Sequence, residues 1–308
     1  MSKGLAQLPP PPMPSRPLPA WARPKDDISE SVDTAFSAGA GLAALDACVR
    51  AEAAFTGLWR NRLALRAAVA HARLAGRREG EGELRDSFAL RTLGDAMEEG
   101  PAGGILRGWR QLVHRSTGIS ARVVDEIAAA FGLNMPDTLT DILRVAESAK
   151  RDQQSPLGSA VRVLSHVHRH HPRAEFLGFW VADCVLAQRL GWPIPLPLLV
   201  TGLGRRRLGR GEEFSDVAIA YARAAAAAVD LHGELARRAA FLMATAPRLR
   251  AKGAGAVVTA LLDDDAVAPA ARLGGMSDRG MRRLCDRLVA LGAARELTGR
   301  PTFRLYGL

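Results

Sequence analysis

Near its C-terminal end the chain reads Ser277-Asp-Arg-Gly-Met-Arg-Arg-Leu-Cys-Asp-Arg-Leu-Val-Ala-Leu291, the most informative segment of the sequence. Its apolar residues recur every three or four positions and form one stripe on a helix, at Met281, Leu284, Leu288 and Leu291. A hydroxyl or carboxylate at Ser277 or Asp278 is expected to cap this helix, and Gly292 ends it. Cys285 lies beside the stripe and is expected to pack as a small core residue.

The opposite face of this helix is basic, with Asp286 as its only acid. Between positions 279 and 304, seven arginines accompany two acids, so the local formal charge is +5. Clustered cations contact phosphates, and an arginine fork can also bond guanine in the major groove. We therefore interpret this segment as a DNA-recognition helix, with the candidate contacts Arg279, Arg282, Arg283 and Arg287.

The flanking segments complete the order of a winged helix-turn-helix. A helix over 256–262 comes first, Asp263-Asp-Asp265 is expected to cap a second helix over 266–273, and Gly274-Gly275 allows a tight turn. After the recognition helix, two strands over 294–297 and 302–306 form a hairpin. This hairpin, the wing, supplies two further candidate DNA contacts, Arg300 and Arg304.

The rest of the chain predicts a mainly α-helical protein. Aromatic residues make up only 5% of the sequence, so the core must consist of Ala, Leu and Val, which favours packed helices. Ala224–Ala228 permits two helices to approach closely. Apolar periodicity, prolines and glycines predict helices over 29–51, 57–75, 83–92, 102–115, 120–131, 137–150, 156–170, 173–190 and 214–245.

Composition shifts suggest three parts. Residues 1–28 form a proline-rich arm, expected to lie on the surface as a semi-rigid leader, with an aromatic groove as its alternative partner. Residues 29–250 form the helical domain, and Lys252-Gly-Ala-Gly255 is the linker to the winged helix over 255–308.

The overall charge of +10 and pI near 10.6 suggest a polyanionic partner, and double-stranded DNA is the first candidate. Because nearly all the cations are arginines, part of this basicity reflects a GC-rich genome. The three cysteines lie too far apart for a CxxC metal site and are odd in number. Polar residues and prolines interrupt the most apolar run, 176–199, so neither a signal segment nor a membrane span is expected. The sequence therefore predicts a cytoplasmic protein without a membrane partner.

Four histidines lie within six positions, at 166, 168, 170 and 171. His166 and His170 would share a helix face at metal-ligand spacing, but a third ligand would have to come from nearby candidates, Glu175, Asp183 or Cys184. A basic helix end stopped by a proline is the favoured interpretation, so we expect neither a metal nor a cofactor. The sequence contains no glycine-rich phosphate loop, nucleophile elbow or acidic metal triad.

The segment from His170-His171-Pro172 to Gly191-Trp-Pro193 resembles the layout of the Fic family of nucleotidyl transferases. In that family a His-Pro-Phe-x-x-Gly-Asn-Gly-Arg motif runs into a helix that ends near a Gly-x-Pro turn. The resemblance implies that His171 would be the catalytic histidine. Two further segments are similar: His71–Gly76 resembles the inhibitory Ser-x-x-x-Glu-Gly segment, and Thr298-Gly-Arg300 resembles the wing of Fic proteins.

The departures from this pattern imply an inactive relative. Arg173–Gly178 contains no Gly-Asn-Gly-Arg that could hold nucleotide phosphates, and Ala75 replaces the inhibitory glutamate. Phosphoryl-type transfer depends on such positioning and charge stabilisation.

The whole chain also resembles an alphaproteobacterial family, often plasmid-borne, that has no assigned function. Four segments carry this resemblance: Trp21–Pro24, Leu186–Pro193, Leu249–Ala256 and Arg295–Gly307. It supports the same division into domains and implies no activity.

The sequence thus predicts a DNA-binding protein, a regulator of transcription or of a bacterial replicon. Two alternatives remain: a diverged and inactive Fic-like nucleotidyl transferase, or a winged helix that docks a protein partner or a second copy of the chain. Nucleotide transfer that depends on His171 would favour the enzyme, and absence of DNA binding at low salt would favour docking.

Overall fold

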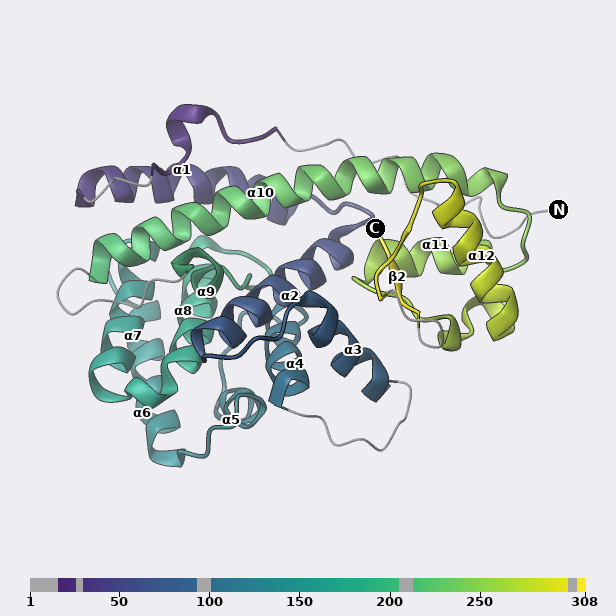
Figure 1. Cartoon of the computed structure of the whole chain (residues 1–308). Coiled ribbons are helices and arrows are strands. Elements are labelled where there is room, and N and C mark those ends of the chain that lie inside the picture. Colours follow the sequence, from purple (N-terminus) through teal and green to yellow (C-terminus); the bar gives the residue numbers. More distant parts are fainter. Residues whose placement is uncertain (1–15, 26–29, 93–100, 205–212, 299–303) are drawn as a thin grey trace.

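The computed structural model describes residues 16–25, 30–92, 101–204, 213–298 and 304–308. Within these ranges the chain is mainly α-helical, as predicted, and has two short strands (Figure 1). The elements are α1 Ser31–Arg50, α2 Thr56–Leu74, α3 Glu81–Thr92, α4 Pro101–Val113, α5 Ala121–Ala130, α6 Pro136–Lys150, α7 Pro156–His170, α8 Glu175–Leu190, α9 Leu199–Leu203, α10 Glu213–Thr245, α11 Ala254–Asp263, α12 Asp278–Ala290, β1 Arg295–Glu296 and β2 Tyr306–Gly307.

Local signals set several helix ends. Ser155 Oγ accepts a hydrogen bond of 3.1 Å from the Gly158 amide, and Pro156 occupies the first turn of α7, where no amide donor is needed. Gly191 ends α8 with φ at +66°, a conformation that glycine adopts without strain. The helices predicted between 29 and 245 therefore match the observed elements within about two residues.

Helices α1 and α10 lie side by side along one edge of the molecule, and α2–α9 pack beneath them (Figure 1). Small residues allow the close approach. A Cβ atom on Gly41 would lie 3.2 Å from Cβ of Ala225, within the predicted alanine run. The alanine-rich sequence therefore acts here as expected, by bringing two helices close together.

One helix was not predicted, α9. The buried carboxylate of Asp183 accepts hydrogen bonds from the amides of Leu198, at 3.0 Å, and Leu199, at 3.2 Å, and so satisfies the start of α9. Burial raises the pKa of Asp183 well above its usual range. Gly202 of α9 lies directly against the backbone of Ala220 in α10. Asp183 is thus a structural residue.

The described part of the N-terminal arm lies on the helical body. Leu18 and Ala22 are buried, and Arg23 donates two hydrogen bonds, of 2.9 and 2.7 Å, to Asp230 of α10. The remainder of the predicted arm, residues 1–15 and 26–28, lies outside the described residues.

Among the described helices, α1 alone is long and apolar enough to cross a membrane. In the structure, 44% of its apolar window is buried inside the protein. A core helix of a globular protein meets the same criteria of length and composition, and α1 packs against α10.

The predicted helix over 266–273 is wrong. Val267 instead forms two antiparallel backbone hydrogen bonds with Tyr306, of 2.8 and 2.9 Å, and short 3-10 turns follow at Pro269–Ala271 and Leu273–Gly275. Pro269 lacks an amide donor, and Arg272 adopts a left-handed φ of +49°, so an α-helix cannot run through this segment. Within the described residues, the predicted hairpin appears as the antiparallel pairs Arg295–Gly307 and Glu296–Tyr306, with a further hydrogen bond of 2.8 Å from the Leu297 amide to the Leu305 carbonyl. Residues 299–303 lie outside the described residues.

The expected cap at Asp263-Asp-Asp265 is also wrong, because the side chains of Asp264 and Asp265 bond to the helical domain. Asp265 is buried and forms ion pairs with Arg62 of α2 and Arg85 of α3. Burial alone would raise the pKa of Asp265, but the two guanidinium groups outweigh it and hold the pKa below its usual value. Asp264 accepts two hydrogen bonds of 2.9 Å from Arg110 of α4.

Apolar contacts accompany these ion pairs, since α11 packs on α2 and one continuous set of buried side chains includes both regions. The boundary near residue 255 stays a prediction from composition. Across it, the segments on either side share buried apolar side chains and the ion pairs of Asp265.

Candidate functional site

The exposed face of α12 carries the predicted basic cluster. Ser277 Oγ accepts a hydrogen bond of 3.2 Å from the Gly280 amide and starts the helix, as expected. The buried face holds Met281, Leu284, Cys285 and Leu288. Burial raises the pKa of the Cys285 thiol to about 12, so it is an inert core group. The residues that point to solvent include four arginines, Arg279, Arg282, Arg283 and Arg287.

Three of these arginines form one row. Arg279, Arg283 and Arg287 are spaced by four residues and therefore lie on one side of α12, over about 12 Å of helix. Among the residues that the structure describes, none of the three has a carboxylate within 4 Å. Their charges are consequently available to an external anion. We call Arg279, Arg283 and Arg287 the arginine row.

The other candidate arginines differ. Arg282 pairs with Asp278 at 3.1 Å on the same helix. Arg304 lies near Asp286, at 3.5 Å, and Glu296, at 3.7 Å, so its charge is shared with two acids. Arg300, the predicted wing tip, lies outside the described residues.

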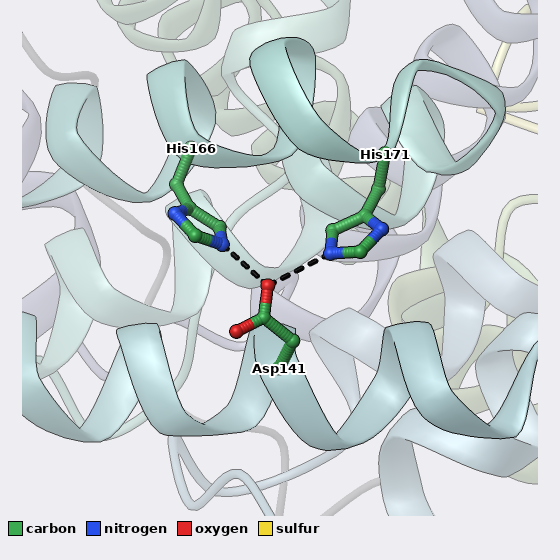
Figure 2. A group of neighbouring side chains, drawn as sticks. All are labelled: Asp141, His166 and His171. Atoms are coloured by element: carbon green, nitrogen blue, oxygen red, sulfur yellow. Dashed lines mark hydrogen bonds and ion pairs between the residues drawn. The ribbon is translucent and has the colours of Figure 1, made fainter.

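A second cluster joins α6 to the end of α7 (Figure 2). One carboxylate oxygen of Asp141, Oδ2, lies 2.5 Å from Nε2 of His166 and 2.8 Å from Nε2 of His171. Hydrogen bonds from His166, His171 and Arg144 hold the pKa of Asp141 well below its usual value. The three side chains offer three donor atoms that lie within 4.8 Å of one another.

The cluster differs from the one that the sequence suggested. His171, and not His170, meets His166 at the carboxylate, although the His170 ring centroid is 4.6 Å from that of His166. The expected third ligands do not take part: Asp183 caps α9, and burial raises the pKa of Cys184 well above its usual value. Among the described residues, the group that could hold a metal ion consists of Asp141, His166 and His171, and Glu175 is not part of it. We call these three residues the metal-ligand group.

Residues 13–308 match a protein family described as a protein of unknown function, DUF1403. The chain belongs to the DUF1403 family. This agrees with the expected membership of a family without an assigned function. Neither the curated proteins nor the solved structures include a match to this DUF1403 protein.

The comparisons do not support the resemblance of the DUF1403 chain to the Fic family. In the segment that resembled a Fic inhibitory motif, His71 is a core residue. Its ring stacks on Phe176, with centroids 3.6 Å apart, and its Nδ1 accepts a hydrogen bond of 3.2 Å from Trp109. Burial and the charge of Arg77 lower the pKa of His71 to about 3.

The DUF1403 structure also has a cavity of about 280 Å³ between the helical domain and the C-terminal segment. Its walls are largely apolar, with Phe88, Leu106 and Leu305 among them. The polar groups at its edge already have partners: Arg85 bonds to Asp265, and Arg110 bonds to Asp264. These charges stabilise the contact between the two regions, so the cavity contributes less to a candidate site than the other two features.

Proposed function

We propose that this DUF1403 protein binds duplex DNA through the exposed face of α12. The observation that carries the proposal is the arginine row, Arg279, Arg283 and Arg287, exposed on one side of a single helix without carboxylate partners among the described residues. Cations arranged along one line suit the phosphates beside a groove, and a major groove about 12 Å wide admits one helix.

The order of elements around α12 supports a winged helix-turn-helix interpretation. The helix α11 is followed by the extended segment at Val267, two 3-10 turns, α12 and the paired strands β1 and β2. In this interpretation the two 3-10 turns occupy the place of the second helix, and α12 is the recognition helix.

The position of α12 also supports the proposal. It lies at one end of the molecule, with α11 between it and α2 (Figure 1). Its buried face packs on the 3-10 turn Pro269–Ala271 and on β1, which leaves the arginine row pointing outward. A recognition helix needs this arrangement, because it must enter a groove without a clash from the rest of the protein.

Two alternatives are weaker. An inactive Fic-like transferase would require His171, and that side chain is bonded to Asp141 without a phosphate-binding loop in the adjacent Arg173–Gly178. A docking module for protein would also expose a helix face. The arginine row has no acidic partners among the described residues, and this favours a polyanion as the ligand over a protein surface. Each arginine that neutralises a DNA phosphate releases condensed counterions, and this release drives binding.

The deciding experiment is a salt series. We would measure the affinity of the full-length protein for labelled random duplex by fluorescence anisotropy at several salt concentrations. A variant with Arg279→Ala, Arg283→Ala and Arg287→Ala should bind more weakly, and its slope of log K against log[salt] should be smaller by about 0.9 for each phosphate that the variant no longer neutralises.

The matched control removes equal charge from exposed arginines elsewhere, by Arg78→Ala, Arg122→Ala and Arg151→Ala. This control should keep most of the affinity, because those arginines lie outside α12. Equal losses in both variants would mean that net charge alone attracts DNA. Absence of binding by the wild-type protein at low salt would reject the proposal and favour the docking module.

A further inference from the structure

We propose that Asp141, His166 and His171 form a binding site for one divalent transition-metal ion, with coordination positions open to solvent. This goes beyond DNA binding and departs from our expectation from the sequence, which favoured no metal. The proposal uses a different part of the molecule from α12, so either proposal can fail without the other.

The local fold explains how two histidines five positions apart reach one point. The helix α7 ends at His170, and His171 leaves the helical path with φ at −135° and ψ at 55°. The His171 amide still bonds to the Val167 carbonyl at 2.7 Å, and Pro172 then starts a 3-10 turn. This turn directs the ring of His171 to the side of α7 that faces α6 (Figure 2).

The geometry is close to that of a metal centre. Each Nε2 points to Asp141, and the second nitrogen of each ring points away from it (Figure 2). Around a tetrahedral zinc ion, donors about 2.0 to 2.2 Å from the metal lie about 3.3 to 3.6 Å from one another. The Nε2 atoms lie 2.5 and 2.8 Å from Asp141 Oδ2, so each would need to move about 0.5 to 1 Å away from this oxygen to admit an ion.

The chemistry of the donors selects the class of metal. Two imidazole nitrogens and one carboxylate oxygen suit zinc, iron(II) or cobalt(II), whereas magnesium and calcium prefer oxygen ligands. Arg144 donates a hydrogen bond of 2.6 Å to the other oxygen of Asp141, Oδ1. Arg144 therefore orients the carboxylate so that Oδ2 faces the histidines, as outer hydrogen-bond partners do in metal sites.

The site is accessible. The side chains of Asp141, His166 and His171 are 28%, 20% and 19% exposed, so an ion can enter from solvent and water can complete its coordination. Three protein ligands with an open position are typical of catalytic zinc sites, whereas structural sites have four. We infer that a bound ion would keep at least one position for water or for a ligand atom from outside the protein.

Without a metal, the same contacts would form a hydrogen-bonded staple between α6 and α7. In that case each histidine donates Nε2–H to Asp141, and the cluster contributes only to stability. The two interpretations differ in one measurable property, because a staple does not bind zinc or cobalt with defined stoichiometry.

The test is titration of the tag-free, chelator-treated full-length protein with Zn²⁺ by calorimetry and with Co²⁺ by visible absorption. We expect one site per chain, a Co²⁺ spectrum of a low-symmetry nitrogen–oxygen site, and a melting temperature that rises with Zn²⁺ concentration. Asp141→Asn and His166→Gln keep hydrogen-bonding groups, and each should weaken Zn²⁺ binding at least about tenfold.

The control variant is His168→Gln, which removes an imidazole from the same turn outside the metal-ligand group. It should bind Zn²⁺ like the wild type. Circular dichroism checks that each variant remains folded, and if His166→Gln does not fold, His171→Gln replaces it. Equal Zn²⁺ affinity of the wild type, Asp141→Asn and the histidine variants would overturn the proposal, as would a wild type that binds no ion in stoichiometric amount.

Discussion

Asp265 Oδ2 accepts a hydrogen bond of 2.6 Å from Nε of Arg85, and this contact joins residues 180 positions apart in the sequence. The same carboxylate also pairs with Arg62. Since the Asp265 side chain is only 4% exposed, its charge has little contact with water and depends on these two partners. This contact joins the C-terminal segment to α2 and α3.

Asp265→Asn should therefore be strongly destabilising. The change removes the acidic partner of Arg62 and leaves Arg85 paired only with Glu81, whose side chain is 45% exposed, and breaking a buried pair in this way costs about 3 to 5 kcal/mol. Urea unfolding followed by circular dichroism measures this loss in the free energy of unfolding. Asp230→Asn is the control, because its pair with Arg23 is about 40% exposed and should contribute less than about 1 kcal/mol. Similar losses in both variants would contradict the importance of burial.

A second prediction concerns acid stability and His71. The folded protein keeps His71 uncharged down to about pH 3, because burial lowers its pKa, whereas the unfolded chain takes up the proton near pH 6.5. Between these values the unfolded state binds more protons, so stability falls as the pH is lowered, by about 1.4 kcal/mol per pH unit from this group. Above about pH 6.5 this effect is absent.

The measurement is the free energy of unfolding of the wild type and of His71→Phe at pH 7, 6 and 5. The variant should lose the contribution of His71 to the pH slope, whatever its stability at pH 7. Parallel pH curves for the wild type and His71→Phe would show that His71 titrates normally in the folded protein.

The third prediction separates the candidate DNA contacts. Arg283 belongs to the arginine row, whereas Arg304 is near Asp286 and Glu296. Arg283→Ala should cost about 1 to 3 kcal/mol on a duplex selected for tight binding and less on random duplex, since base contacts are specific. Arg304→Ala should change neither affinity by more than a few tenths of a kcal/mol. Competition between the two duplexes measures both effects, and a greater loss for Arg304→Ala would move the interface from α12 to the wing.

The fourth prediction tests helix packing. A Cβ atom on Gly202 would lie 1.8 Å from the carbonyl oxygen of Ala220, so Gly202→Ala must push α9 from α10 and should cost about 1 to 3 kcal/mol or more. Gly39, within α1, has nothing within 4 Å of the corresponding position. Gly39→Ala should therefore stabilise the protein by about 0.5 to 1 kcal/mol, because alanine favours helix. Thermal unfolding measures both changes. Gly202→Ala should lower the melting temperature and Gly39→Ala should raise it, and a change of the same sign in both variants would contradict the prediction.

Most helices could be predicted because their signals are local. Apolar spacing, Ser155 with Pro156, and Gly191 specify the beginning or end of a helix within a few residues of sequence. The prediction of a helix over 266–273 was wrong because the alanines and the leucine of this segment favour helix locally, whereas Val267 pairs with Tyr306 from the end of the chain. Tertiary pairing overrode propensity there.

The candidate sites divide in the same way. The arginine row could be predicted, because helical spacing within one segment places its members on one face. Asp141 could not, because it lies 25 positions before His166 on a different helix and has no motif around it. The role of Asp265 was missed for the same reason, since its partners Arg62 and Arg85 are distant in sequence.

The long helix α10 limits where residues can be inserted into the chain. It packs against α1 over much of its course (Figure 1). Near its end, a Cβ atom placed on Gly292 of the C-terminal segment would lie 3.9 Å from the ring of Phe241. Each added residue turns a helix by about 100° and lengthens it by about 1.5 Å. One inserted residue between these two contacts would turn the following part of α10 by about 100°, so we expect it to weaken the ion pairs of Asp265 with Arg62 and Arg85. Two full turns, about seven residues, would restore the angle but leave an axial shift of about 10 Å. The number of residues in α10 therefore determines the angle between α1 and the C-terminal segment, and we expect insertions within α10 to destabilise the protein.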